Sequence, residues 1–139
     1  RWVGPAEVVR VGGPGLVAAP ADMPEGWAPT TGRFLLRTDS HVLDAPIGPG
    51  FSALSAELVH WLADRGVTLV GIDTPSVDPF ESKELPAHRA LIERGLTWIE
   101  GLWLAEVEPG PYLLAALPLR LEGAEAAPLR AIVRPLGKV

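Results

Sequence analysis

The chain has 139 residues, of which 47% are hydrophobic and 21% charged, and its formal net charge at pH 7 is −5. This length fits one domain, spanning residues 1–139, and the composition excludes an intrinsically disordered protein. An acidic balance without a basic cluster gives neither nucleic acid nor an anionic membrane an electrostatic reason to bind. Because the sequence has no cysteine, thiolate zinc sites and disulfides are excluded, and any metal would be bound by His, Asp or Glu.

Segments that address a protein to a membrane or export it are not found in the sequence. The longest apolar segment, Tyr112 to Leu119, is far shorter than the roughly 20 residues that span a bilayer. No signal-peptide core is present, so we expect a cytoplasmic location. Position 1 is Arg rather than Met, and we therefore expect these residues to be part of a longer polypeptide.

The N-terminal third predicts two strands separated by a loop. Ala6–Val11 and Arg33–Thr38 are apolar runs of strand length. Several prolines punctuate the connection from Leu16 to Thr31, whose Met23 and Trp27 are expected to pin it to the core.

A loop and a helix follow. The loop Asp39–Phe51 contains His41 and Asp44, and His41 is interpreted either as a functional loop residue or as a solvated one. Ser55 is a suitable N-cap for a helix that runs to Arg65, and His60 is expected on its solvent face. The opposite, buried face of this helix is expected to hold Leu54, Leu58, Trp61 and Leu62.

Residues 67–102 predict a strand, a helix and a second strand, and they hold the candidate functional residues. Val67–Ile72 is typical of a strand buried on both faces. We expect Ser82 to cap a helix that ends at Arg94, with Gly95 in the left-handed conformation. Leu96–Glu100 is then the second strand.

Helical periodicity places His88 on the buried face with Leu85, Leu91 and Ile92, and Glu100 is the one charged residue at the end of the following strand. A β-α-β crossover brings the helix start and the carboxyl ends of both strands, with Asp73, to one sheet edge. The helix dipole favours the neutral imidazole that ligates metal. A core histidine and a structural ion pair are the alternatives for these two residues.

The C-terminal region predicts an antiparallel pair of strands, Tyr112–Leu121 and Leu129–Val133. The fold class expected for the chain is therefore α/β, a mixed β-sheet with a parallel β-α-β unit and antiparallel C-terminal strands.

Several segments together resemble the bacterial kynurenine formamidases, which are arylformamidases of the metal-dependent cyclase family. The segments are RGVTLVGIDTPSVD at 65–78, Ser82-Lys83, Ala87-His88-Arg89, Ile99-Glu100-Gly101-Leu102 and Ala116-Leu117-Pro118-Leu119. The resemblance implies the swivelling β/β/α-type fold of that family and a homodimer. It also implies a hydrolase that converts N-formyl-L-kynurenine to L-kynurenine and formate in tryptophan degradation, with divalent metal, usually two zinc ions per active site.

The resemblance also assigns residues. His88 and Glu100 match the two late metal ligands of the family, and Asp73, Ser76 and Asp78 match a loop expected to hydrogen-bond around those ligands. The earlier family motif H-x-G-T-H-x-D-x-P-x-H does not occur in residues 1–139, so no catalytic residue is assigned and the chain alone is expected to be inactive. Two alternatives stay open: a cyclase-family hydrolase of another amide, lactam or ester, and a non-catalytic domain that retains the fold.

Overall fold

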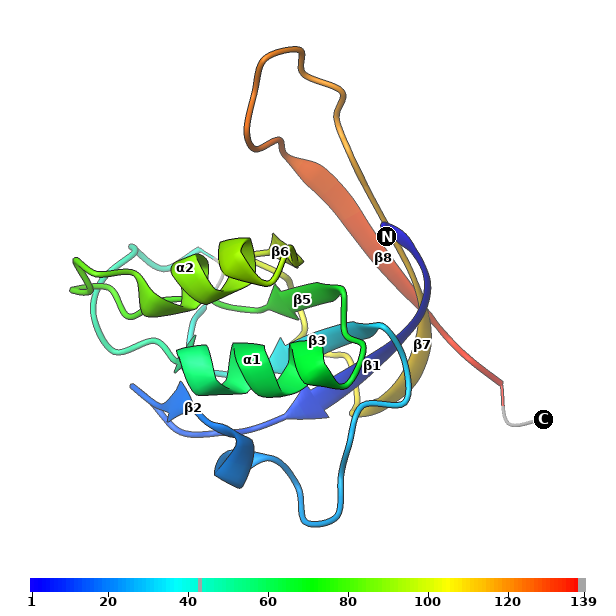
Figure 1. The fold of residues 1–139 in the computed structure, drawn as a ribbon, viewed down its shortest axis with the longest axis horizontal. Helices are drawn as coiled ribbons and strands as arrows, with labels where there is room; N and C mark the ends of the chain where they lie inside the picture. Colours follow the sequence, from blue (N-terminus) through cyan, green and yellow to red (C-terminus); the bar gives the residue numbers. More distant parts are fainter. Residues whose placement is uncertain (43, 138–139) are drawn as a thin grey trace.

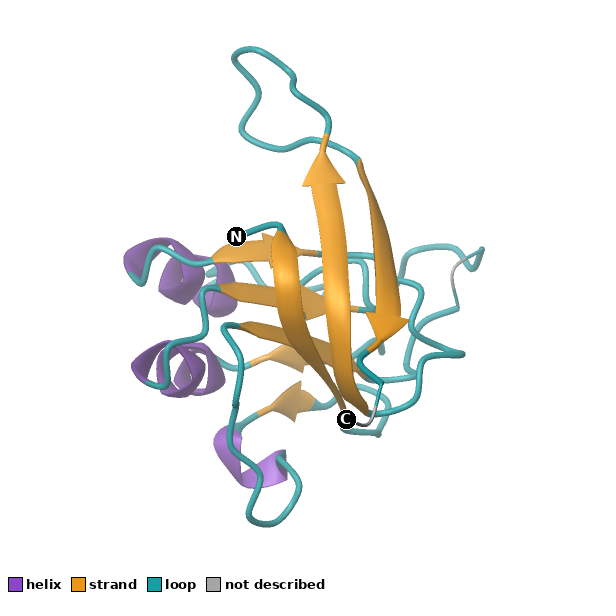
Figure 2. Ribbon diagram, turned by 90° about the vertical axis from the view of Figure 1, so that its right-hand side faces the viewer, coloured by secondary structure: helices purple, strands orange, loops and turns teal. Residues whose placement is uncertain are grey.

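A curled, six-stranded mixed sheet forms the centre of the molecule (Figures 1 and 2). The computed structural model describes residues 1–42 and 44–137, so residue 43 of the expected 39–51 loop lies outside it. The spatial order of the strands is β6-β5-β3-β1-β7-β8. Their bounds are β1 Val3–Arg10, β3 Arg33–Arg37, β5 Leu69–Ile72, β6 Thr97–Ile99, β7 Gly110–Pro118 and β8 Leu129–Pro135.

Strand directions confirm the expected mixed sheet. β1, β3, β5 and β6 run parallel, whereas β7 is antiparallel to β1 and β8 is antiparallel to β7. β7 ends at Pro118 rather than at the expected Leu121, and the connection to β8 projects beyond the body of the molecule (Figure 1). One more hydrogen bond follows Pro118, from the Leu119 N–H to the Pro128 carbonyl at 3.1 Å. Pro128 has no N–H with which to return it, so the regular pairing stops there.

Two α-helices cover one face of the sheet, α1 (Ala56–Asp64) and α2 (Pro86–Glu93) (Figure 2). The Ser55 hydroxyl accepts a 3.0 Å hydrogen bond from the Leu58 N–H, which confirms the expected cap of α1. Between helices and sheet lies a core that includes Phe34, Leu62 and Leu91, all fully buried. The described residues contain no helix with the length and apolar character that crossing a bilayer requires.

The segment before β3 is packed onto this core, as expected. Met23 is buried, and the Trp27 ring lies 5.5 Å from Phe34 and 6.0 Å from Trp61, measured between centroids. The segment also contains a 3-10 turn, η1 (Pro20–Asp22), and strand β2 (Val17–Ala18), which pairs in parallel with β4 (Ala53–Leu54). Strands of two residues have no readable periodicity, so the sequence did not predict this pair.

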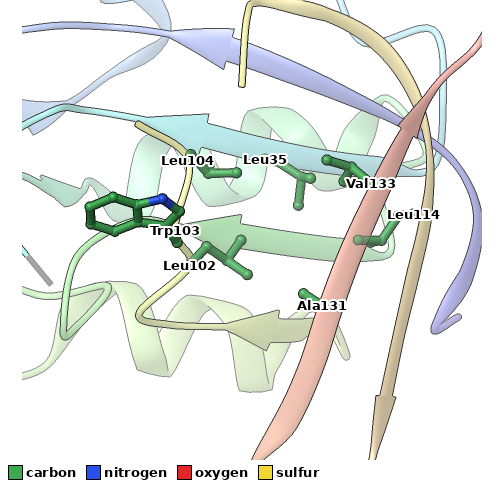
Figure 3. A pocket seen from close by; sticks show the side chains of 7 residues that line it. All are labelled: Leu35, Leu102, Trp103, Leu104, Leu114, Ala131 and Val133. Carbon is green, nitrogen blue, oxygen red and sulfur yellow. The ribbon is translucent and has the colours of Figure 1, made fainter. Parts of the chain in front are cut away.

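The other, concave face of the sheet carries a second apolar cluster. Ala6, Leu35 and Leu114 are fully buried there, beneath the segment that follows β6. A cavity of about 80 Å³ remains between that segment and β8 (Figure 3). Its walls are apolar, and they consist of Leu35, Leu102, Trp103, Leu104, Leu114, Ala131 and Val133.

The start of α2 differs from the sequence prediction. The N-cap residue is Leu85, in a left-handed conformation with φ 48°, and Ser82 instead accepts a hydrogen bond from the Leu85 N–H at 3.2 Å. The first free N–H groups of the helix, those of Ala87 and His88, donate to the carboxylate of Asp78 at 2.8 and 3.0 Å. The Asp78 carboxylate therefore caps α2, and the prediction that Ser82 does so is wrong.

Candidate metal centre

The candidate residues lie at the sheet edge where the parallel strands end. The loops after β3 and β5 and the N-terminus of α2 meet at this edge, on the left in Figure 1. Parallel strands joined by crossovers place their carboxyl ends together, as the sequence predicted.

His88 and Glu100 approach each other closely at this edge. The distance from His88 Nε2 to Glu100 Oε1 is 3.4 Å, and the two side chains are 24% and 29% exposed. The Val77 N–H donates to Glu100 Oε1 at 2.9 Å, so the carboxylate has the partner that a half-buried charge requires. Both groups are more accessible than the sequence indicated, which leaves them open to a ligand.

Asp78 fixes the orientation of the His88 ring. Its carboxylate is fully buried and lies 2.7 Å from His88 Nδ1, in addition to the two backbone N–H groups that it caps. Because a carboxylate accepts hydrogen bonds, Nδ1 carries a proton towards Asp78, and Nε2 is the ring atom that faces Glu100. This carboxylate-histidine arrangement is the one that orients metal-binding histidines.

The face of α2 that carries His88 needs a correction. Leu85 and Ile92 were expected beside it in the core, but they are 41% and 67% exposed. The helix does bury Leu91, as expected, but together with Ala87 and Ala90. His88 lies at the margin of that face, because α2 packs through its small alanines and α1 occupies the adjoining side.

An aromatic side chain supports the imidazole. Trp98 of β6 packs edge-on against the His88 ring, with centroids 5.5 Å apart and an interplanar angle of 89°. β6 is shorter than the expected strand, so Glu100 directly follows it. Trp98 and Glu100 nevertheless both contact His88, as their expected common side predicted. The ring is thus held both by a hydrogen bond and by packing.

The separation of the two candidate ligands fits a shared metal ion. Two ligand atoms bound at about 2.1 Å to one tetrahedral zinc lie about 3.4 Å apart, which matches the distance between His88 Nε2 and Glu100 Oε1. Within residues 1–42 and 44–137, no group of three or more His, Cys, Asp or Glu side chains could hold a metal. The described residues therefore bring together one pair of candidate ligands, fewer than a catalytic zinc site uses.

Asp73 and Ser76, the other residues expected near the ligands, have different contacts. Asp73 accepts hydrogen bonds from the Thr38 hydroxyl, the Thr38 N–H and the Asp39 N–H at 2.7 to 3.0 Å. Among the described residues, no hydrogen bond joins Asp73 to His88 or Glu100. Ser76 accepts from the Asp78 N–H at 3.1 Å and so supports the loop that carries Asp78.

An ion-pair cluster lies at the ends of β1 and β3. The Asp39 carboxylate accepts from Arg37 Nε at 2.7 Å and from Arg10 Nε at 2.6 Å. The Arg37 hydrogen bond, reinforced by Arg10, holds the pKa of Asp39 below its ordinary value, and the same bond raises the pKa of Arg37. The sequence analysis did not single out these residues, because they converge only when β1 and β3 pair.

The remaining histidines are far less engaged. His60 lies half-buried on α1, where the sequence predicted a solvent-facing residue. His41 is partly exposed and packs edge-on against Phe51, with centroids 6.4 Å apart.

Comparison with known proteins places the chain in a family. The family model described as "Putative cyclase" matches residues 1–79. The chain belongs to the cyclase family. This match confirms the resemblance that the motifs indicated.

Relatives of this cyclase-family chain include a kynurenine formamidase of Salinibacter ruber, 44% identical over 138 residues, which cover 96% of the chain and 63% of the relative. A kynurenine formamidase of Bordetella pertussis is 41% identical over 135 residues, covering 97% of the chain and 65% of the relative. The chain therefore spans slightly less than two thirds of the length of these relatives.

A solved structure of a potential metal-dependent hydrolase with cyclase activity has the same fold. It matches the cyclase-family chain with a TM-score of 0.74 at 26% identity, over 95% of this chain and 65% of that one.

Proposed function

We propose that this cyclase-family chain contributes two metal ligands, His88 and Glu100, to a hydrolase of the formamide bond in N-formyl-L-kynurenine. The observation that carries the proposal is the 3.4 Å approach of His88 Nε2 to Glu100 Oε1, with Asp78 holding Nδ1 at 2.7 Å. Two relatives named kynurenine formamidase support the substrate, and the structural relative described as metal-dependent supports a divalent metal.

The reaction adds water to the formyl carbon and breaks the bond between that carbon and the aryl nitrogen. The water oxygen leaves in formate and a proton passes to the released amine, so that the products are formate and L-kynurenine. A divalent metal, when bound, supplies Lewis-acid polarisation and lowers the pKa of a coordinated water.

The residues of the chain have distinct tasks in this proposal. His88 Nε2 and the Glu100 carboxylate hold the ion, and Asp78 keeps the imidazole in the tautomer that can do so. The Val77 N–H fixes one oxygen of Glu100, which limits the rotation of the carboxylate. Hydrogen bonds to the main chain thus hold the Glu100 and Asp78 carboxylates in place before a metal binds.

A complete centre needs further ligands. A catalytic zinc ion takes three protein ligands and a water, and the described residues offer two at this position. We propose zinc as the metal, two ions per active site, with the other ligands provided by polypeptide outside residues 1–139 or by a second subunit of a homodimer.

A pair of histidine variants in the intact enzyme tests this function. His88→Ala is expected to lower metal affinity and formate release from N-formyl-L-kynurenine by at least about 100-fold, because it removes a ligand. His60→Ala, on α1, is the matched control and is expected to stay within about twofold of the unsubstituted enzyme.

Metal content after dialysis and formate release at saturating substrate are the measurements. Equal losses in the two variants would contradict the assignment of His88. Intact metal binding without formamide hydrolysis in the unsubstituted protein would contradict the substrate but not the ligands.

A further inference from the structure

Three aromatic rings form a continuous row at the edge that carries the candidate metal centre. The Phe51 ring packs edge-on against His41 at 6.4 Å and edge-on against Phe80 at 6.5 Å, measured between centroids. Phe51 is 6% exposed, whereas Phe80 is 51% exposed. The row therefore has a buried anchor and an accessible ring at one end.

Val77 links Glu100 to the segment that carries Phe51. Val77 donates its N–H to Glu100 Oε1 at 2.9 Å, and its carbonyl accepts from the Leu54 N–H at 2.8 Å. Phe51 precedes Leu54 by three residues, and Phe80 follows Asp78, the partner of His88, by two. Because successive Cα atoms are about 3.8 Å apart, Phe80 lies within about 8 Å of Asp78 between Cα atoms.

A buried polar network holds the row in place. The Asp73 carboxylate accepts from Thr38, and the Thr38 and Ser40 hydroxyls are hydrogen-bonded at 2.7 Å. The Ser40 hydroxyl accepts from the N–H of the fully buried Ser52, beside Phe51. The backbone beside Phe51 is thereby fixed.

The position of Phe80 is also set by its backbone. Pro79 and Ser82 close a turn around it, with the Ser82 N–H donating to the Pro79 carbonyl at 2.9 Å. A half-exposed phenyl ring on a fixed turn, two residues after the partner of His88, is suited to hold a flat apolar group of a substrate.

We propose that Phe80, supported by Phe51 and His41, binds the aryl ring of the substrate and so selects aryl formamides over alkyl formamides. This inference rests on the proposed function for its turnover test. Phe80 is a specificity residue in this scheme: it contacts the part of the substrate that does not react.

Three variants of the metal-loaded enzyme test the proposal. Phe80→Leu keeps apolar bulk but removes the ring, and it is expected to lower the ratio of kcat/KM for N-formyl-L-kynurenine to kcat/KM for an N-formyl alkylamine by about 3- to 10-fold. Phe80→Tyr keeps the ring and is expected to retain the ratio. Ile132→Ala, at an exposed position of β8, is the control for loss of surface apolar area.

Calorimetric binding of L-kynurenine makes the test independent of turnover. Phe80→Leu is expected to weaken this binding by about 3- to 10-fold, and Phe80→Tyr and Ile132→Ala to leave it unchanged. An unchanged substrate ratio and unchanged kynurenine binding in Phe80→Leu would overturn the proposal, as would equal losses in Phe80→Tyr. If the unsubstituted enzyme hydrolysed neither formamide, the proposed function would fail, while kynurenine binding would still decide the aryl site.

Discussion

At the scale of a single residue, Asp78 both caps α2 and orients His88. The same buried carboxylate accepts the first free N–H groups of α2 and the Nδ1 proton of His88. The positive end of the helix dipole favours negative charge at this position, which lowers the cost of burying the carboxylate. The position of α2 and the orientation of the candidate ligand therefore depend on one side chain.

Asp39 determines a pH dependence at the same scale. Its pKa is lowered in the folded protein by Arg37 and Arg10, so the stabilisation is fully present above the unfolded pKa and is lost as pH falls through the folded pKa. We expect Asp39→Asn to reduce the free energy of unfolding by about 0.5 to 1 kcal/mol at pH 7, and to have little effect at a pH below the folded value. Asn accommodates the left-handed backbone at this position, where φ is 54°.

Urea unfolding of Asp39→Asn at neutral and at acid pH measures this effect. Glu125→Gln provides a control, because Glu125 is exposed and no ion pair involves it within the described residues. The same stability deficit at both pH values would show that Asp39 acts through something other than its charge.

At the scale of elements, the sheet is shaped by one close approach within β5. A Cβ atom at Gly71 would lie 2.6 Å from Leu35 Cδ2 and 2.7 Å from Leu102 Cδ1. Glycine in this strand lets the segment after β6 fold back across the concave face. That segment continues from Glu100, so the packing at Gly71 bears on the position of the candidate ligand.

We expect Gly71→Ala to reduce the free energy of unfolding by about 1 to 3 kcal/mol through overpacking. The lower part of that range is favoured, because Leu102 borders the cavity of the concave face and can shift into it. Gly12→Ala is the matched control, since an added Cβ there meets no atom within 4 Å. Equal urea midpoints for the two variants would contradict this account of β5.

At the scale of the whole molecule, the two faces of the sheet differ in how they are covered. Helices α1 and α2 bury one face, whereas the other is closed by the curl of β7 and β8 and by the segment after β6 (Figure 2). The candidate ligands lie at the edge between these coverings. Such an edge is where an additional part of the polypeptide or a second subunit can bring further ligands.

Zinc retention by residues 1–139 alone tests this view of the whole molecule. We expect the isolated chain to retain well under one zinc ion after dialysis, because two protein ligands bind the ion weakly. His88→Ala in the same chain is the reference for non-specific binding, and metal analysis is the readout. Stoichiometric zinc in the unsubstituted chain would mean that these residues, or a neighbouring copy, complete the site.

The sequence by itself determined the elements whose signals are local. Apolar runs located β3 and β5. Gly95, after α2, has the left-handed conformation that the sequence predicted, with φ 64°. The approach of His88 to Glu100 was also predictable, because crossover topology places a helix start beside the strand ends. Resemblance of the motifs to a family added the chemistry that these two residues imply.

Only the tertiary structure decided which polar groups meet. Asp78 caps α2 from eight residues before Pro86, Asp73 turns to Thr38, and Phe80 packs on Phe51 from another loop. No local pattern encodes these pairings, because a side chain's partner depends on the path of each loop and on the strand order of the sheet. Periodicity likewise could not predict that α2 packs through its alanines and leaves His88 at the margin of the buried face. Packing against α1 sets the rotation of α2 about its axis.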